Sequence, residues 1–150
     1  MKLQIDQSDA YGEVEIIIRC STMDAPLTRL VEQIRLYGFS LHGKKDGATV
    51  LIRPEDVFYF ESIDGRTFLY LEKEVYACEA RLYEIEERLC RGAFVRISKA
   101  AILNMHKLAG FRAQLNGKLE ARLVNGERLE VNRHYVPALK ARLSEMGEWK

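Results

Sequence analysis

The stretch Phe94 to Asn104, FVRISKAAILN, decides the fold of this chain. Its apolar positions are typical of strands: Phe94, Val95, Ile97, Ala101, Ile102 and Leu103. Between them lie Arg96, Ser98 and Lys99, which place two cations and a hydroxyl within four residues. We therefore predict two strands joined by a short polar loop. An anion lying against that loop would meet both charges and a hydrogen-bond donor.

A second basic cluster, Asn132-Arg133-His134-Tyr135, lies nearer the C-terminus. It follows another strand-like run and opens the last helical segment, and a helix N-terminus favours phosphate. Two polar clusters of this kind, both held by β structure, predict a surface that binds a negatively charged partner.

Charge is distributed unevenly along the chain, although the formal net charge is only +1. Residues 53–90 contain five Lys and Arg against ten Asp and Glu, whereas residues 91–142 contain eleven against three. A basic C-terminal third behind an acidic middle is typical of a protein that directs one face to phosphate. The alternative is that strand-rich segments simply carry Lys and Arg on their solvated face.

The composition is that of a globular domain. The 150 residues are 47% hydrophobic and 30% charged, which suits one domain or a domain with a small appendage. No apolar run approaches the ~18 residues of a membrane span, and the N-terminus is too polar for a signal peptide. The three cysteines, Cys20, Cys78 and Cys90, are odd in number and lack a CxxC spacing. We therefore expect a reduced, cytoplasmic protein.

Residues 1–43 are predicted to form a small βα extension. Val14–Arg19 is strand-like, and Asp24 is a candidate N-cap for a helix that ends at Gly38. Such an extension can dimerise the protein, act as a regulatory element or cover a sheet edge. The polar, glycine-punctuated residues 44–47 are the best candidate for a linker to the rest of the chain.

Residues 48–150 are predicted to form a mainly β domain with small helices. Asp64-Gly65, Asn116-Gly117 and Asn125-Gly126 are signals for hairpin turns. The expected strands, besides the two in the central stretch, are Thr49–Arg53, Val57–Glu61, Thr67–Leu71, Val75–Cys78, 109–115, 119–124 and Arg128–Val131. A helix is expected over 80–91, and Pro137 predicts that the last helix begins at Tyr135 or Val136.

The order of several segments resembles the LytTR family of bacterial DNA-binding domains. These segments are IRPEDVFYFES, GRTFLYL, LYEIEERL, FVRISKAAILN and LNGKLEARLVNGERLEVNRHYVPALKARL. The resemblance is specific because ordered segments agree in sequence and spacing across about two thirds of the chain. It implies an elongated, mostly antiparallel β fold whose loops enter successive major grooves of bent DNA. The short N-terminal extension is similar to that of the small stand-alone regulators of this family, which lack a receiver domain.

The resemblance implies a DNA contact from the hairpin loop around Asp64-Gly65. The position matching Thr67 contacts DNA in family members, and Arg66 stands beside it. This chain has threonine where other members place a histidine, which leaves the base preference of the loop open. The alternative is that Thr67 is a plain strand residue.

The resemblance implies a second contact from the loop of the central stretch. The base-reading position of the family falls on Lys99, and lysine can donate to guanine O6 and N7. Arg96 and Ser98 are then expected on the DNA backbone. The alternative for Arg96 is an ion pair with an acid across the sheet.

The third implied contact is Arg133, which falls where the family's arginine reads or grips DNA. Asn132 and His134 flank it, and we expect both to contribute to the same contact. The alternative for Arg133 is a surface arginine near a helix start.

The function implied by the resemblance is sequence-specific regulation of transcription, without enzymatic activity and without a cofactor. The expected partner is double-stranded DNA, commonly at paired direct repeats. A homodimer is expected, at least on DNA. Genes of the stand-alone type are often paired in their operons with a membrane protein, so a membrane-bound inhibitor is a further candidate partner.

Two other classes of function remain as alternatives. A non-enzymatic module that binds RNA or an acidic protein is one, although the exposed aromatic pair of many RNA-binding sheets is missing. An enzyme would use Cys78 or Cys90 as nucleophile with a histidine, but neither cysteine lies in a glycine-rich turn. The sequence also lacks paired carboxylates, a phosphate loop and metal-ligand spacing of His42, His106 and His134.

Overall fold

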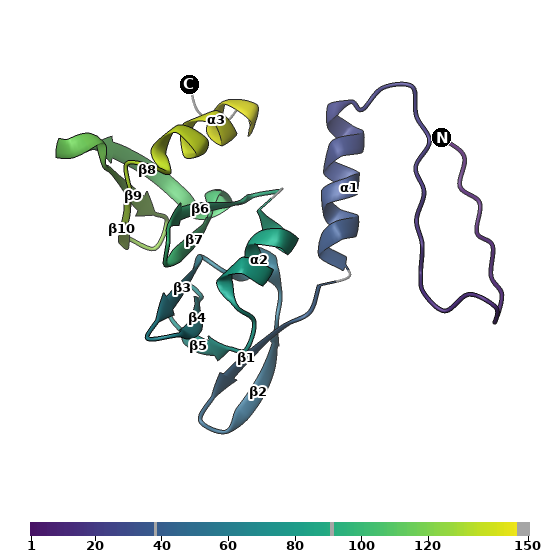
Figure 1. Ribbon diagram of the computed structural model, residues 1–150, viewed down its shortest axis with the longest axis horizontal. Helices are drawn as coiled ribbons and strands as arrows, with labels where there is room; N and C mark the ends of the chain where they lie inside the picture. Colours follow the sequence, from purple (N-terminus) through teal and green to yellow (C-terminus); the bar gives the residue numbers. More distant parts are fainter. Residues whose placement is uncertain (38, 91, 147–150) are drawn as a thin grey trace.

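The computed structural model describes residues 1–37, 39–90 and 92–146. In these residues the chain forms two antiparallel sheets and three α-helices, preceded by an extended N-terminal segment (Figure 1). The strand order is β2-β1-β5-β4-β3-β7-β6 in the large sheet and β10-β9-β8 in the small one. The prediction of a mainly β fold with small helices is confirmed. Among the described residues, every helix is too short or too polar to span a bilayer.

The elements have the following bounds. The large sheet contains β1 (Leu41–Lys45), β2 (Ala48–Ile52), β3 (Tyr59–Ile63), β4 (Arg66–Tyr70), β5 (Val75–Cys78), β6 (Phe94–Ser98) and β7 (Ala101–Asn104). The small sheet contains β8 (Leu108–Ala113), β9 (Leu119–Leu123) and β10 (Arg128–Val131). The helices are α1 (Ala25–Tyr37), α2 (Leu82–Leu89) and α3 (Val136–Met146).

The central strands of the large sheet are buried on both faces. Phe60 and Ile102 pack in one core cluster with α2. Their strand neighbours Tyr59 and Leu103 pack in a second cluster with the small sheet and α3. Because successive side chains of a strand point to opposite faces, two covered faces require apolar residues at nearly every position. Five apolar residues of the expected strands are all buried: Phe58, Phe60, Phe94, Ile97 and Ile102.

The predicted turns have the backbone that their sequences favour. Asp64 and Gly65 both have positive φ, 51° and 78°, and join β3 to β4. Asn116 and Gly117, with φ of 64° and 75°, join β8 to β9. Positive φ at both central residues matches the twist of paired strands, and Asn, Asp and Gly tolerate it best. The hairpin predictions are confirmed.

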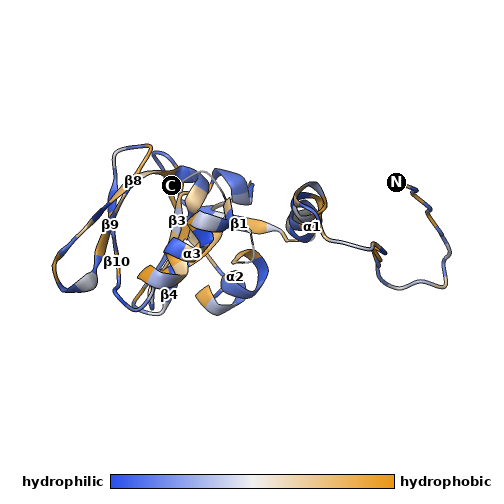
Figure 2. Cartoon of the chain, turned by 90° about the horizontal axis from the view of Figure 1, so that it is seen from above, coloured by the Kyte–Doolittle hydropathy of each residue, from blue (hydrophilic) through white to orange (hydrophobic). Residues whose placement is uncertain are grey.

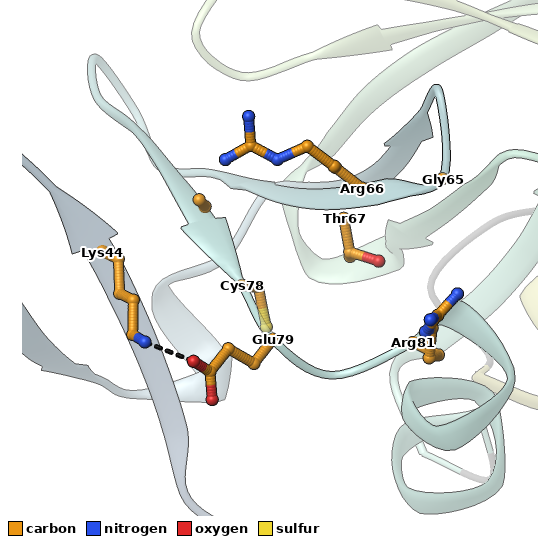
Figure 3. Close-up of a pocket in the computed structure, with 8 residues that line it drawn as sticks. Lys44, Gly65, Arg66, Thr67, Cys78, Glu79 and Arg81 are labelled. Atoms are coloured by element: carbon orange, nitrogen blue, oxygen red, sulfur yellow. Dashed lines mark hydrogen bonds and ion pairs between the residues drawn. The ribbon is translucent and has the colours of Figure 1, made fainter.

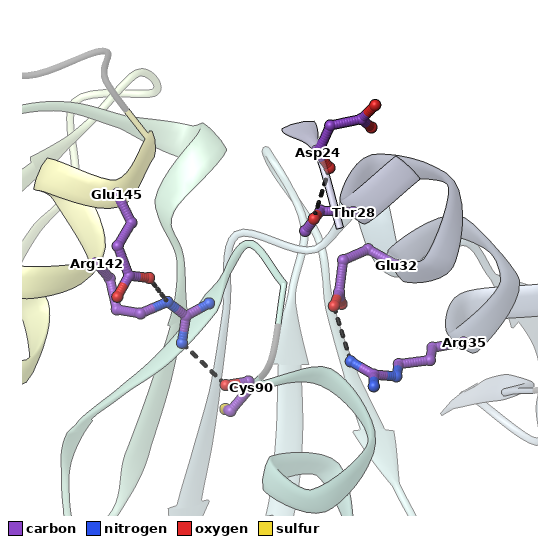
Figure 4. A network of polar contacts seen from close by, with 7 residues as sticks. All are labelled: Asp24, Thr28, Glu32, Arg35, Cys90, Arg142 and Glu145. Atoms are coloured by element: carbon purple, nitrogen blue, oxygen red, sulfur yellow. Dashed lines mark hydrogen bonds and ion pairs between the residues drawn. The ribbon is translucent and has the colours of Figure 1, made fainter. Parts of the chain in front are cut away.

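Helix α1 begins where its capping residue predicts. The carboxylate of Asp24 accepts a hydrogen bond from the backbone N–H of Leu27 at 2.8 Å. The hydroxyl of Thr28 donates to the backbone carbonyl of Asp24 at 2.9 Å (Figure 4). Gly38, the expected C-cap, lies outside the described residues.

Helix α3 begins at Val136, as Pro137 predicts, and a polar contact ties its far end to α2. The Arg142 guanidinium donates to the carbonyl oxygen of Cys90 at 2.9 Å and lies 3.9 Å from the Glu145 carboxylate (Figure 4). The C-terminal helix is therefore joined to the helix on the other side of the large sheet.

The predicted strand Val14–Arg19 is wrong, because these residues lie in an extended segment that pairs with no other strand of the described chain. Figures 1 and 2 show α1 standing between this segment and the sheets. A strand-like pattern forms a strand only when a neighbour completes its backbone hydrogen bonds. In a single copy of the chain the predicted βα extension is therefore reduced to a helix.

The predicted linker at residues 44–47 is also wrong. Lys44 and Lys45 end β1, and Asp46-Gly47 is the turn of the β1–β2 hairpin. Gly43, just before the predicted linker, has a packing role in β1. A Cβ atom on Gly43 would lie 2.7 Å from the Cβ of Tyr76 on β5. A side chain at this position would prevent β1 from approaching β5, so the glycine serves sheet pairing and not a flexible connection.

One buried polar residue fastens the end of β7. Asn104 is 1% exposed; its side-chain amide donates to the Val57 carbonyl at 2.8 Å, and its side-chain oxygen accepts from the N–H of His106 at 3.0 Å. We predict that Asn104→Ala lowers the free energy of unfolding by about 1–3 kcal/mol, because both partners lose their hydrogen bonds in a buried place. Urea denaturation measures this, and a loss below about 0.5 kcal/mol would contradict it.

Candidate nucleic-acid interface

Three loops that are distant in sequence lie in a row at one end of the large sheet, where its strands turn. The N–H of Ser62, at the end of β3, donates to the carbonyl of Ala100 in the β6–β7 loop at 2.8 Å. The N–H of Asn132, after β10, donates to the carbonyl of Ile97 on β6 at 2.9 Å. We call residues 62–67, 98–100 and 132–134 together the loop edge. It brings together all three groups of residues that the sequence predicts as contacts.

A fourth turn joins the loop edge. A Cβ atom built on Gly117, in the β8–β9 turn, would lie 3.4 Å from the Cβ of Arg133. Leu115 in the same turn is 87% exposed. The sequence predicted this turn but gave no sign that it lies beside Arg133, because only the packing of the small sheet decides that neighbour.

Arg66 and Thr67 point to opposite sides of β4 (Figure 3). Arg66 is exposed, and its guanidinium lies 5.4 Å from the centroid of the Phe68 ring. Thr67 is 5% exposed, which favours the alternative that it is a strand residue. Arg66 is thus the cation that this loop presents to solvent.

A shallow cavity of about 310 Å³ lies beside Arg66 and Thr67 (Figure 3). Lys44 and Arg81 contribute two further cations to its lining, and the Lys44 ammonium forms an ion pair with Glu79. The positive charge at this end of the sheet therefore extends beyond the three loops.

Arg96 holds the loop between β6 and β7. Its guanidinium donates to the carbonyl oxygens of Ser98, at 2.8 Å, and of Lys99, and it forms an ion pair of 2.9 Å with Glu86 of α2. The pairing of β6 with β7 shifts register between Arg96 and Ser98, so the strand bulges where the arginine acts. All these contacts are internal, and the acid that pairs with Arg96 comes from a helix instead of the sheet.

Ser98 and Lys99 have different tasks in this loop. The Ser98 hydroxyl accepts a hydrogen bond from the N–H of Ala100 at 3.2 Å, which closes the turn locally. Lys99 is exposed, and among the described residues it has no acidic partner. The ammonium group is free to meet an external anion while its own carbonyl is held by Arg96.

The turn before α3 is built by Asn132. Its side-chain oxygen accepts from the N–H of His134 at 3.0 Å, and its carbonyl accepts from the N–H of Tyr135 at 2.8 Å. Arg133 and His134 are both exposed, and no carboxylate in the described part of the chain pairs with either. Tyr135 packs against the core cluster under α3.

Cys78 and Cys90 lack the environment of a nucleophile. Burial raises the pKa of the Cys90 thiol to about 12, and the nearby Glu86 carboxylate adds to the rise. Burial also raises the pKa of the Cys78 thiol. A nucleophilic cysteine needs a lowered pKa, so both thiols remain protonated and unreactive near neutral pH.

Exposed cations on hydrogen-bonded loops at one end of a β fold are typical of a domain that binds anions. The family model of the LytTr DNA-binding domain matches residues 47–144, and the chain belongs to this LytTR family. The family consists of DNA-binding domains and not of enzymes, in agreement with the sequence analysis.

Several known proteins are similar to this chain. The sensory transduction protein LytT of Enterococcus faecalis is 28% identical over 93 residues, which cover 62% of this chain and only 38% of that protein. An uncharacterised HTH-type transcriptional regulator of Staphylococcus aureus is 29% identical over 105 residues, covering 70% of this chain and 71% of the regulator. A solved LytTr DNA-binding domain from Bacillus cereus superposes with a TM-score of 0.67 at 22% identity, covering 71% of this chain and 98% of that domain. The last comparison confirms the predicted fold.

We predict that Cys20 reacts much faster than Cys78 and Cys90 with a thiol reagent in the native protein at about pH 8. Cys20 is exposed, whereas burial keeps the other two thiols protonated. Peptide mapping after timed alkylation measures the three rates, with urea-unfolded protein as the control. Rapid alkylation of Cys90 in the folded chain would contradict the raised pKa.

A second prediction concerns Arg96. Arg96→Lys keeps the charge but loses the fork that holds the carbonyls of Ser98 and Lys99, so amide hydrogen exchange in residues 97–101 should accelerate at least several-fold. Affinity for DNA should fall with it, although the number of cations is unchanged. Glu86→Gln is the matched variant, because it weakens the same anchor from the other side. Unchanged exchange in both variants would show that Arg96 does not hold the loop.

Proposed function

We propose that this protein is a sequence-specific regulator of transcription that reads the major groove of double-stranded DNA with its loop edge. One observation supports the proposal most. The backbone hydrogen bonds from Ser62 to Ala100 and from Asn132 to Ile97 align three loops that carry the exposed cations Arg66, Lys99 and Arg133. A row of cations at spacing fixed by the backbone suits a regular polyanion better than a single small anion.

The contacts differ in the task that we assign to them. Lys99 is assigned to a base edge, where its free ammonium can donate to guanine. Arg133 is assigned to the groove or the adjoining phosphate, with Asn132 shaping its turn and His134 beside it. Arg66 is assigned to a phosphate at the other end of the row.

The remaining predicted contacts act through their neighbours. Arg96 and Ser98 position the Lys99 loop by internal hydrogen bonds, and Thr67 supports Arg66 from the buried side of β4. This division separates residues that set register from residues that carry sequence preference.

The wider context is also part of the proposal. We propose that two copies bind paired direct repeats, that the protein works in the cytoplasm, and that a membrane-bound inhibitor is its regulatory partner. The Staphylococcus aureus relative is described as an uncharacterised HTH-type transcriptional regulator, which supports the regulatory role. RNA or an acidic protein are the alternative ligands, and the binding experiment below distinguishes them.

We predict that Lys99→Ala and Arg133→Ala each lower affinity for the specific duplex by about 1–3 kcal/mol without unfolding the domain. The measurement is fluorescence anisotropy with DNA from the protein's own upstream region, at two salt concentrations, against a scrambled duplex. Lys99→Ala should also reduce the difference between the two duplexes, since it removes a contact to a base. Both variants should reduce the slope of log affinity against log salt.

Lys73 and Arg53 lie outside the loop edge and serve as control positions. Lys73 is exposed in the turn between β4 and β5, and Arg53 is exposed between β2 and β3, where it forms an ion pair with Glu55. Lys73→Ala and Arg53→Ala remove the same kinds of charge and should leave specific affinity nearly unchanged. Equal losses in all four variants would mean that only net charge matters. Equal weak binding to both duplexes, or stronger binding to single-stranded RNA, would contradict the assignment to a DNA operator.

A further inference from the structure

We propose that two copies of this protein form a dimer by strand exchange, in which residues 14–19 of each copy add a strand to the open edge of β2 of the other. The proposal concerns assembly in the absence of DNA, so it does not rest on the proposed function. It is argued from two features of the chain that lack a neighbour in a single copy.

The first feature is the edge of the large sheet at β2. No strand of the described chain pairs with the side of β2 that faces away from β1. Residues 48–52, ATVLI, contain no charge and no proline, and Val50 and Leu51 are 38% and 72% exposed. An exposed, apolar edge strand is a ready template for another strand.

The opposite edge of the same sheet shows how an edge is protected. Strand β6 carries Arg96 and a bulge, and it packs with α3 and β10. Charges and bulges of this kind are the usual means by which proteins block pairing at an edge. Strand β2 has neither, which indicates an edge kept available for a partner.

The second feature is the segment Val14–Arg19, VEIIIR. It has a mixed strand pattern, in which Val14, Ile16 and Ile18 would share one face and Ile17 would lie on the other. These three side chains are 86%, 57% and 39% exposed in the single copy. A run of β-branched residues left in water is unfavourable both for its apolar surface and for its backbone.

Each feature supplies what the other lacks. The backbone groups of residues 14–19 would pair with those on the open side of β2. The face that carries Val14, Ile16 and Ile18 would extend the face of β2 that carries Val50 and the buried Ile52. This single contact would complete the backbone hydrogen bonds of β2 and of residues 14–19. It would also bury the exposed apolar side chains of both strands.

The occupant is a second copy because the segment of the same chain is held away from β2. Helix α1 has 13 residues, about 20 Å long, and it lies between the segment and the sheets in Figures 1 and 2. Residues 20–24 span at most about 17 Å when extended. This is shorter than the length of α1, so they cannot lead residues 14–19 back past the helix to β2 of the same copy. The side chain of Glu32 lies within 3.0 Å of a Cβ built on Gly92, so α1 itself sits against the body.

Reciprocal exchange gives a closed assembly. Each copy offers one segment and one edge, so two copies related by a two-fold axis use both and leave none open. Growth then ends at the dimer, and the exposed edge does not lead to fibres.

The test is the mass of the whole chain in solution without DNA, by light scattering after size exclusion over a range of concentrations. The native protein should have twice the monomer mass of 17.3 kDa. Ile16→Lys combined with Ile18→Lys should raise the dimer dissociation constant by roughly tenfold or more, because two buried isoleucines become charged. Val50→Lys, on the face of β2 that these isoleucines would extend, should have a similar effect. Neither change can unfold the domain by itself, since all three residues are exposed in the single copy.

The matched control is Leu3→Lys combined with Ile5→Lys. These residues are 84% and 80% exposed in the same N-terminal segment but lie outside the proposed strand, so the dimer should persist. A second measurement identifies the contact directly. In a Cys20→Ser background, Ile17→Cys protein is mixed with Leu51→Cys protein and treated with a short bifunctional maleimide, and a covalent dimer of the two variants is expected.

The other outcomes would overturn the proposal. A native monomer at all concentrations would show that the segment and the edge do not pair between copies. A dimer that is lost with Val50→Lys but kept with the isoleucine variant would assign the edge to direct β2–β2 pairing. Masses that keep growing with concentration would exclude reciprocal closure.

Discussion

Burial of the central strands on both faces is the constraint on which the rest of this structure depends. Strands β3, β7 and β6 lie between α2 on one side and the small sheet with α3 on the other. A shift of one residue in any of these strands would exchange its two sets of side chains between two differently shaped cores. The register is therefore fixed, and with it the point at which each strand ends. The loop edge is a consequence of that register.

The loop edge uses its positive charges in two ways. Arg96 is directed inward, where it holds the carbonyls of Ser98 and Lys99 and pairs with Glu86. Lys99, three residues further along the chain, is left without an acidic partner among the described residues. An arginine fork suits the first task because its planar donors fix several acceptors at once, and a flexible lysine suits the second. The same loop thus contains both a rigid support and a mobile cation.

The sequence predicted most of the sheet but misjudged the N-terminal quarter. The pattern around Gly43 is typical of a linker, yet the glycine is required by the close approach of Tyr76 on β5, a residue more than thirty positions away. The segment Val14–Arg19 has a strand pattern but finds no partner in the single copy. Thr67 occupies a position implied in DNA contact, and its burial follows from facing the inner side of β4. In each case the structure that the residue adopts depends on a neighbour that is distant in the sequence, or on the lack of one, and a local pattern does not reveal this.

The class of fold, the hairpin turns and the positions of charge can be predicted from the sequence, because they follow from period, turn chemistry and composition within short windows. The resemblance to the LytTR family implied the three groups of contact residues. Only the tertiary structure decided that these groups form one row, that Gly117 lies beside Arg133, and that Arg96 faces inward. The reason is physical: hydrogen bonds such as those from Ser62 to Ala100 and from Asn132 to Ile97 join residues about forty positions apart along the chain. No local pattern specifies such pairs, and the shared core fixes them all at once.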